Sequence, residues 1–145
     1  MVKRVTRSGI NGFTLIEVMI VVLVVALLAA IAMPQYKRYV ESTRRVDATS
    51  TLMRMAVLQE RYFFQRSMYT TDIDELGGDL SPEGWYDITI DTTGCDENSC
   101  NAFTITATPT EQGPQGGDTR CKTFSINQTL RQTATGDDAD NCWQQ

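Results

Sequence analysis

The 145-residue sequence contains no histidine, so the side chain that most often serves as a general acid or base near neutral pH is missing. It also lacks a phosphate-binding loop, because the glycine-rich stretch 113–117 contains no lysine and precedes no predicted helix. No pair of carboxylates stands in a recognisable catalytic motif. These absences predict a protein that is not an enzyme and that needs no cofactor.

Basic residues are scarce in the C-terminal half of the chain. Residues 67–145 carry fourteen acids against only three bases, Arg120, Lys122 and Arg131, for a net charge of −11. Residues 34–66 carry seven bases against three acids, for +4. Nucleic-acid binding requires a basic surface, so the charge balance argues against a nucleic-acid partner unless the three bases gather in one place.

Glycine and proline are absent from the 32 positions 35–66, so nothing there interrupts a helix. Apolar residues recur every three or four positions, with polar residues between them. The pattern predicts an amphipathic helix over 34–66. We expect the aromatic cluster at its end, Tyr62-Phe63-Phe64, to pack into the core.

A long apolar run precedes this helix. Every residue from Val18 to Met33 is apolar, and between Phe13 and Met33 only Thr14 and Glu17 are polar. At about 1.5 Å per residue, these 21 residues span roughly 30 Å, the thickness of the hydrocarbon core of a bilayer. Bases and no acids precede the run, which predicts that this end stays in the cytoplasm. Because Glu17 would lie within the hydrocarbon core of the bilayer, its carboxylate needs a cation as a partner.

The residues Gly12-Phe13-Thr14-Leu15-Ile16-Glu17, followed by the apolar run, resemble the processing site and N-terminal helix of the type IV pilin family. The resemblance implies that residues 1–12 are a leader, which a prepilin peptidase removes between Gly12 and Phe13 before methylating the new amino group of Phe13. It also implies that Glu17 pairs with the N-terminal amine of a neighbouring subunit. The amine would lie four residues from Glu17, on the same helical face.

The resemblance also implies partners and a location. The partners are other pilin subunits, bound through the N-terminal helix, together with the prepilin peptidase and the pilus assembly machinery. Before assembly the chain would cross the bacterial inner membrane once, with its N-terminus cytoplasmic and its head periplasmic. After assembly it would be part of an extracellular pilus.

Other interpretations of the N-terminal region compete with this one. The small residues Ala30-Ile31-Ala32 fit a signal-peptidase site, which would release a secreted domain starting at Met33. A plain signal anchor is a second alternative. The length of the run and the position of Glu17 argue against the signal-peptidase site, and the combination of a basic leader, Gly12, the motif 13–17 and an unbroken apolar helix favours the pilin-like interpretation over both.

Pro34 follows the apolar run directly. Because proline removes a helical hydrogen bond, we expect a kink or local melting there, and the alternative is a helix end with a fresh start. A proline at this place is common in the family. The expected organisation is a membrane and filament-core helix over 13–33, its amphipathic continuation over 34–66 and a globular head over 67–145.

The head begins with a connection over 67–85, in which a short helical turn precedes two glycines. Alternating apolar residues then predict a sheet within 86–135. Its strands contain Tyr86, Ile88 and Ile90, then Phe103, Ile105 and Ala107 within 102–108, then Phe124 and Ile126, with a weaker fourth over 130–135. An antiparallel meander of three or four strands packed on the long helix gives an α+β fold.

The four cysteines, Cys95, Cys100, Cys121 and Cys142, all lie in the head. In an exported domain without histidine they predict two disulfides, for which three connectivities are possible. We favour Cys95–Cys100 around a tight connection between strands, together with Cys121–Cys142. The second resembles the disulfide that bounds the C-terminal loop of many pilins, and it would staple the region 121–142.

No metal site is expected. The cysteine spacing is wrong for zinc. The stretch 136–141 carries three carboxylates and an amide that could ligate calcium, as some pilin-like secretion subunits do, but it lacks the final glutamate of an EF-hand. We favour a solvated turn beside a disulfide.

The predicted function is that of a structural subunit of a type IV pilus, for pilus biogenesis, twitching motility, adhesion or DNA uptake. The segment 103–109 and the ending Cys142-Trp143 resemble the PilE-like minor pilins of gamma-proteobacteria, and four cysteines depart from the commonest two-cysteine major pilin. The alternatives are a pseudopilin of a type II secretion system and a DNA-receptor pilin for natural transformation.

Overall fold

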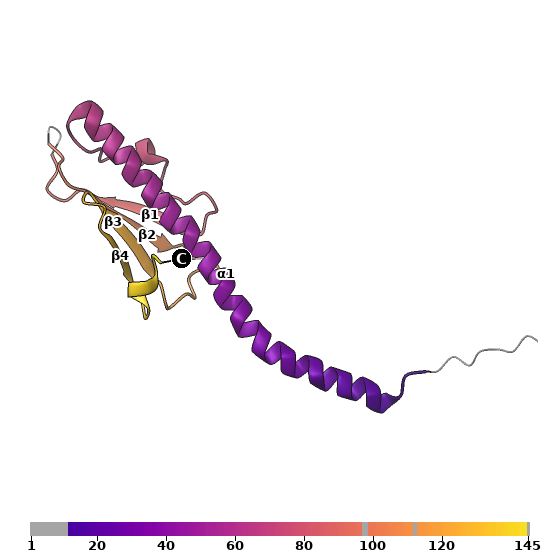
Figure 1. The fold of residues 1–145 in the computed structure, drawn as a ribbon. Coiled ribbons are helices and arrows are strands. Elements are labelled where there is room, and N and C mark those ends of the chain that lie inside the picture. The colour runs from indigo at the N-terminus through magenta and orange to yellow at the C-terminus, as the bar shows by residue number, and fades with distance from the viewer. Residues whose placement is uncertain (1–11, 97–98, 112, 145) are drawn as a thin grey trace, which may run out of the picture. The chain divides into compact units, whose positions relative to one another are not determined.

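The structure is a computed structural model that describes residues 12–96, 99–111 and 113–144. The predicted leader before Gly12, with its three bases, and part of the connection between Cys95 and Cys100 lie outside these residues. The elements are α1 (Leu15–Arg66), η1 (Asp74–Leu76), β1 (Tyr86–Asp91), β2 (Thr104–Pro109), β3 (Thr123–Asn127), β4 (Gln132–Thr135) and η2 (Ala139–Asn141) (Figure 1).

The chain divides into two compact units, Met1–Arg38 and Tyr39–Gln145. In the first unit, α1 is long and apolar enough to cross a membrane, and no residue of its most apolar stretch is buried. A helical segment that leaves such a run uncovered needs lipid or other protein chains around it. Pro34 lies inside α1, which is assigned as one helix, and the kink expected at this residue stays a prediction.

The second unit contains a four-stranded sheet in the order β1-β2-β3-β4, with every neighbouring pair antiparallel. Figure 1 shows the second half of α1 lying across this sheet. The predicted α+β fold, a long helix on an antiparallel meander, is therefore confirmed. The weaker fourth strand exists but starts at Gln132, because Leu130 has a positive φ of 57° and belongs to the turn after β3.

The core lies between one face of the sheet and one stripe of α1. Strand residues in alternate positions are buried on the sheet side, and α1 contributes residues spaced three and four apart, as the two periodicities require. The fully or nearly fully buried residues are Ala48, Leu52, Met55 and Ala56 from α1, and Tyr86, Ile88, Ile105, Ala107, Phe124 and Ile126 from the strands. Phe103, just before β2, joins them.

The prediction that the whole aromatic cluster packs into the core is wrong. Phe63 packs on Tyr69, with ring centroids 4.7 Å apart, but Phe64 is 91% exposed. The ring of Tyr62 lies under the guanidinium of Arg66 instead. Consecutive helical residues point about 100° apart, so three in a row cannot face one core.

The connection between α1 and β1 is held to the helix by Gln59, which is fully buried. Its side-chain amide donates to the carbonyl oxygen of Thr70 at 2.9 Å and accepts from the Thr70 N–H at 2.9 Å. The predicted short turn is η1, and it ends at Gly77. This segment therefore starts from a fixed point on α1.

Candidate functional site

The N-terminal end of α1 holds the residues predicted to be processed. Gly12 and Phe13 precede the helix and are exposed, and Glu17 lies in its first turn. The hydroxyl oxygen of Thr14 accepts a hydrogen bond from the Glu17 N–H at 3.3 Å, so Thr14 caps the helix. The Thr-x-x-Glu spacing is a capping-box signal that the sequence analysis missed.

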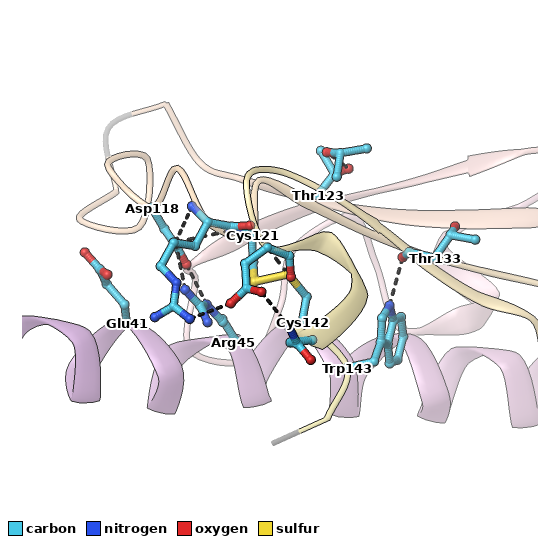
Figure 2. The surroundings of a disulfide bond; sticks show 12 residues. Glu41, Arg45, Asp118, Cys121, Thr123, Thr133, Cys142 and Trp143 are labelled. Atoms are coloured by element: carbon cyan, nitrogen blue, oxygen red, sulfur yellow. Dashed lines mark hydrogen bonds and ion pairs between the residues drawn. A yellow bond between two sulfur atoms is a disulfide. The ribbon is translucent and has the colours of Figure 1, made fainter.

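In the second unit, a buried ion pair joins α1 to the loop between β2 and β3 (Figure 2). Arg45 and Asp118 are 5% and 3% exposed. The Arg45 guanidinium donates through Nε to Asp118 Oδ2 at 2.6 Å and through Nη2 to Oδ1 at 2.8 Å. Such a two-point contact fixes both the distance and the orientation of the two groups.

Asp118 also organises its own loop. Its carboxylate accepts from the Gln115 amide at 2.9 Å and from the N–H groups of Arg120 and Cys121 at 3.1 and 3.3 Å. Gln115, which is fully buried, donates in addition to the carbonyl oxygen of Glu41 at 3.3 Å. The loop before β3 is therefore anchored on α1 at two places.

Tyr86 of β1 lies at the edge of this cluster and is fully buried. Burial raises the pKa of its hydroxyl far above the ordinary value, and the negative charge of Asp118 raises the pKa further. The phenol is therefore neutral at any physiological pH.

The C-terminal region is stapled to the start of β3. Cys121 pairs with Cys142, and Cys95 pairs with Cys100. Trp143, next to Cys142 in the chain, packs edge-on against Phe124, with the ring centroids 5.9 Å apart. Figure 2 shows its indole donating to the carbonyl oxygen of Thr133, at 2.8 Å. Trp143 thus lies against β4 and the core.

A glycine makes the turn into this region possible. Gly136, directly after β4, has φ 128°, and a Cβ there would lie 2.3 Å from the carbonyl oxygen of Arg120. This close approach lets the N–H groups of Asp137 and Asp138 donate to the carbonyl oxygens of Thr119 and Arg120. Only glycine fits both the space and the backbone conformation.

The acidic stretch 136–141 contains one carboxylate whose two oxygens both have donors. The Asp138 carboxylate accepts from Asn141 Nδ2 at 2.7 Å and pairs with the guanidinium of Arg120. The hydrogen bond from Asn141 and the one from Arg120 lower the pKa of Asp138. Among the described residues no three His, Cys, Asp or Glu side chains group as metal ligands.

One further contact joins α1 to the segment before β1. The Arg44 guanidinium lies 4.8 Å from the centre of the Trp85 ring, a cation–π geometry. The sequence analysis treated Arg44 and Arg45 only as charges of the basic helix. Arg44 is half-buried and Arg45 is buried, and nothing in the local pattern distinguishes the two bases apart from the position of Arg45 on the core-facing side of α1.

The N-terminal region matches the model of the prokaryotic N-terminal methylation motif over residues 7–33. Residues 34–125 match the model described as "Type IV minor pilin ComP, DNA uptake sequence receptor". The chain belongs to the type IV pilin family. Together the two matches cover the pilin from the predicted leader to β3.

Individual pilins support this assignment. The chain is 26% identical over 144 residues to the fimbrial protein EcpC of Eikenella corrodens, covering 99% of this pilin and 84% of that protein. It is 35% identical over 73 residues to the type IV major pilin PilA of Myxococcus xanthus, covering 50% and 32% of the two chains. It is 38% identical over 94 residues to the type IV major fimbrial protein FimA of Dichelobacter nodosus, covering 61% and 59%.

The chain therefore spans about a third of PilA and three fifths of FimA. The fold resembles that of the crystal structure of the Neisseria meningitidis non-core minor pilin PilV, with a TM-score of 0.52 and 22% identity. That match covers 68% of this pilin and 89% of the other chain.

Proposed function

We propose that this pilin is a minor structural subunit of a type IV pilus. Two features together carry the proposal. The most apolar stretch of α1 has no buried residue, and the α+β head is held together by disulfides. Such a segment is covered by lipid before assembly and by neighbouring helices afterwards. The family assignment and the PilV-like fold support the same role. The finer assignment to the PilE-like branch stays a prediction.

Assembly would begin with processing. A prepilin peptidase would cut between Gly12 and Phe13 and methylate Phe13, leaving residues 13–33 in the inner membrane and the head in the periplasm. The match to the methylation motif over residues 7–33 supports this step. The new amine would be available to Glu17 of a neighbouring subunit, since Glu17 lies within the first turn of α1 and opposite charges attract strongly away from water.

The test is the N-terminal residue and the mass of the protein recovered from native membranes and from native pili. We expect N-methylated Phe13 and a mass four hydrogens below that of the reduced chain, which corresponds to two disulfides. A chain that starts at Met33 and is absent from pili would overturn the proposal.

A second experiment tests the role of the Glu17 charge. Glu17→Ala should be processed normally but should not enter pili. Thr14→Ala is the matched control, because it removes the helix cap that Thr14 provides for the Glu17 N–H while the carboxylate remains. Normal pilus entry of Glu17→Ala, or an equal loss for both variants, would contradict charge pairing.

A role as a DNA receptor is the second candidate, and the family model over residues 34–125 favours it, since its description names a DNA uptake sequence receptor. The charge of the head opposes it: residues 67–145 carry −11, and Arg120 is already paired with Asp138. Lys122 and Arg131 remain exposed and would have to supply the phosphate contacts.

DNA mobility shifts with the full chain in detergent, at several salt concentrations, distinguish the two roles. A receptor should bind more weakly as salt rises and should lose binding in the Lys122→Gln, Arg131→Gln double variant. The double variant Arg38→Gln, Arg61→Gln, with both changes on α1, is the control. No shift at low salt would reject the receptor role and leave the structural one.

A further inference from the structure

Three consecutive residues of α1 follow the apolar run and are open to the surroundings of the helix. Tyr36 is 71% exposed, and Lys37 and Arg38 are exposed as well. All three belong to the first unit of the chain. The Arg38 guanidinium has no hydrogen-bond or ion-pair partner among the described residues. We call these three residues the collar.

We propose that the collar binds the headgroups of anionic phospholipids at the outer end of the membrane segment. The inference rests on the proposed function, because it concerns the pilin while its N-terminal helix is still in the bilayer. It adds a class of ligand, a lipid with a net negative charge, and the position along α1 at which that lipid is held.

The collar stands at the depth of the lipid headgroups. Residues 13–33 fill the hydrocarbon core of about 30 Å, and the headgroup layer adds roughly 5–7 Å on each side. The collar follows Met33 by three to five positions in the same helix. At about 1.5 Å per residue, it lies roughly 4.5–7.5 Å beyond the hydrocarbon core. This distance matches the thickness of the headgroup layer.

The chemistry of the collar suits that layer. A tyrosine ring is favoured at the membrane interface, because its apolar part contacts lipid while its hydroxyl reaches water. The guanidinium of Arg38 can bind a phosphate group at two points, and the ammonium of Lys37 can bind one as a point charge. No acid lies between Glu17 and Glu41, so residues 18–40 carry +2. This net charge favours an anionic lipid over one without net charge.

The arrangement around the helix favours lipid over a protein partner. Consecutive helical residues point about 100° apart, so the three side chains spread over roughly 200° of the helix circumference. A protein that docks on one side of a helix contacts residues three and four positions apart. Lipid surrounds a membrane helix, so it can contact all three residues of the collar at once.

The bases of the collar stand on the side of the membrane where bases are usually scarce. Lysine and arginine are in excess on the cytoplasmic side of membrane segments, whereas the proposed orientation puts the collar on the periplasmic side. Cleavage after Gly12 would remove the three bases of the leader. The basic side chains nearest the apolar run are then Lys37 and Arg38. A contact with anionic headgroups offsets the unfavourable placement of these two charges.

Fluorescence quenching by brominated lipids tests the proposal. The full chain carries Tyr36→Trp, which keeps an aromatic ring in the collar, and it is reconstituted in vesicles of phosphatidylglycerol and phosphatidylcholine. Bromine is placed on the acyl chains, close to the headgroup, of either the anionic phosphatidylglycerol or the uncharged phosphatidylcholine. Trp85 and Trp143 belong to the second unit, and the chain without the substitution gives their contribution. The ratio of the two quenching values reports which lipid is preferred at residue 36, and we expect it to be phosphatidylglycerol.

Charge variants in the Tyr36→Trp chain provide the second measurement. Arg38→Gln should lower the preference for phosphatidylglycerol about fivefold, the effect of one base near an anionic surface, and adding Lys37→Gln should lower it further. Arg38→Lys should keep most of the preference, because the charge remains. The double variant Arg61→Gln, Arg66→Gln removes two exposed bases from the other end of α1; it is the matched control and should leave the preference unchanged.

Each outcome decides a separate point. The proposal is overturned if neither lipid quenches residue 36, if the preference is the same with and without Arg38→Gln, or if the control lowers it equally. The presence of the subunit in pili would then leave the proposed function standing. A preference that falls with Arg38→Gln, in a subunit that is absent from pili, would instead overturn the proposed function and keep the lipid contact.

Discussion

The buried pair of Arg45 and Asp118 gives the sharpest test of how the head is held on α1. Both side chains are almost fully buried and in bidentate contact. Asp118→Ala would leave the Arg45 guanidinium buried without its partner, and removing one member of a buried ion pair costs about 3–5 kcal/mol. The N–H groups of Arg120 and Cys121 would lose their acceptor as well.

Arg45→Met should cost less, about 3 kcal/mol, because the Asp118 carboxylate keeps its bonds from Gln115 and from two backbone N–H groups. The double variant Arg45→Met, Asp118→Leu leaves no buried charge at either position. We expect it to be no less stable than Asp118→Ala, so that its loss falls short of the sum of the two single losses by at least about 3 kcal/mol.

The assay is urea unfolding of the full chain in detergent, with both disulfides intact and with tryptophan fluorescence as the signal. Trp85 and Trp143 both lie in the head. The exposed pair of Arg120 and Asp138 is the matched control, and its removal should have a much smaller effect because water screens it. Strictly additive losses at Arg45 and Asp118, or a loss from Asp118→Ala no larger than the control, would refute the reasoning.

Three other predictions concern the two disulfides, the buried Gln59 and the carboxylate of Asp138. Replacing Cys121 and Cys142 by serine should lower the unfolding free energy by about 3 kcal/mol, and replacing Cys95 and Cys100 by about 2 kcal/mol, since the first pair closes the longer loop; reversal of this order in urea unfolding would contradict loop closure as the cause. Gln59→Leu should cost about 2–4 kcal/mol, because the buried N–H and C=O of Thr70 lose their partners, whereas Gln65→Leu at an exposed site of α1 should change little in the same assay. The pKa of Asp138 is lower in the folded chain than the ordinary value of 3.8, so its contacts stabilise the fold above that pH and are lost as the pH falls through the folded pKa. Carboxyl NMR titration should show that both Asn141→Ala and Arg120→Gln raise this pKa, and equal pKa values in all three proteins would count against the contacts.

The sequence alone was sufficient for the architecture of this pilin. The apolar run, the 32 residues without glycine or proline and the alternating pattern from Tyr86 to Ile126 are local signals, and each depends only on the period of a helix or a strand. They predicted the long helix and the antiparallel sheet. The strand limits were less exact, because turn residues such as Leu130 take their conformation from the bonds that close the turn.

Only the tertiary structure decided which charges and aromatic rings are buried. Arg44 and Arg45 are adjacent and chemically identical, yet Arg45 pairs with Asp118, 73 positions away, while Arg44 lies over Trp85. Phe63 and Phe64 differ in the same way. A helix turns about 100° per residue, so neighbours in the sequence face different surroundings. Which surroundings they meet depends on how the distant β2–β3 loop and the connection between α1 and β1 pack on the helix.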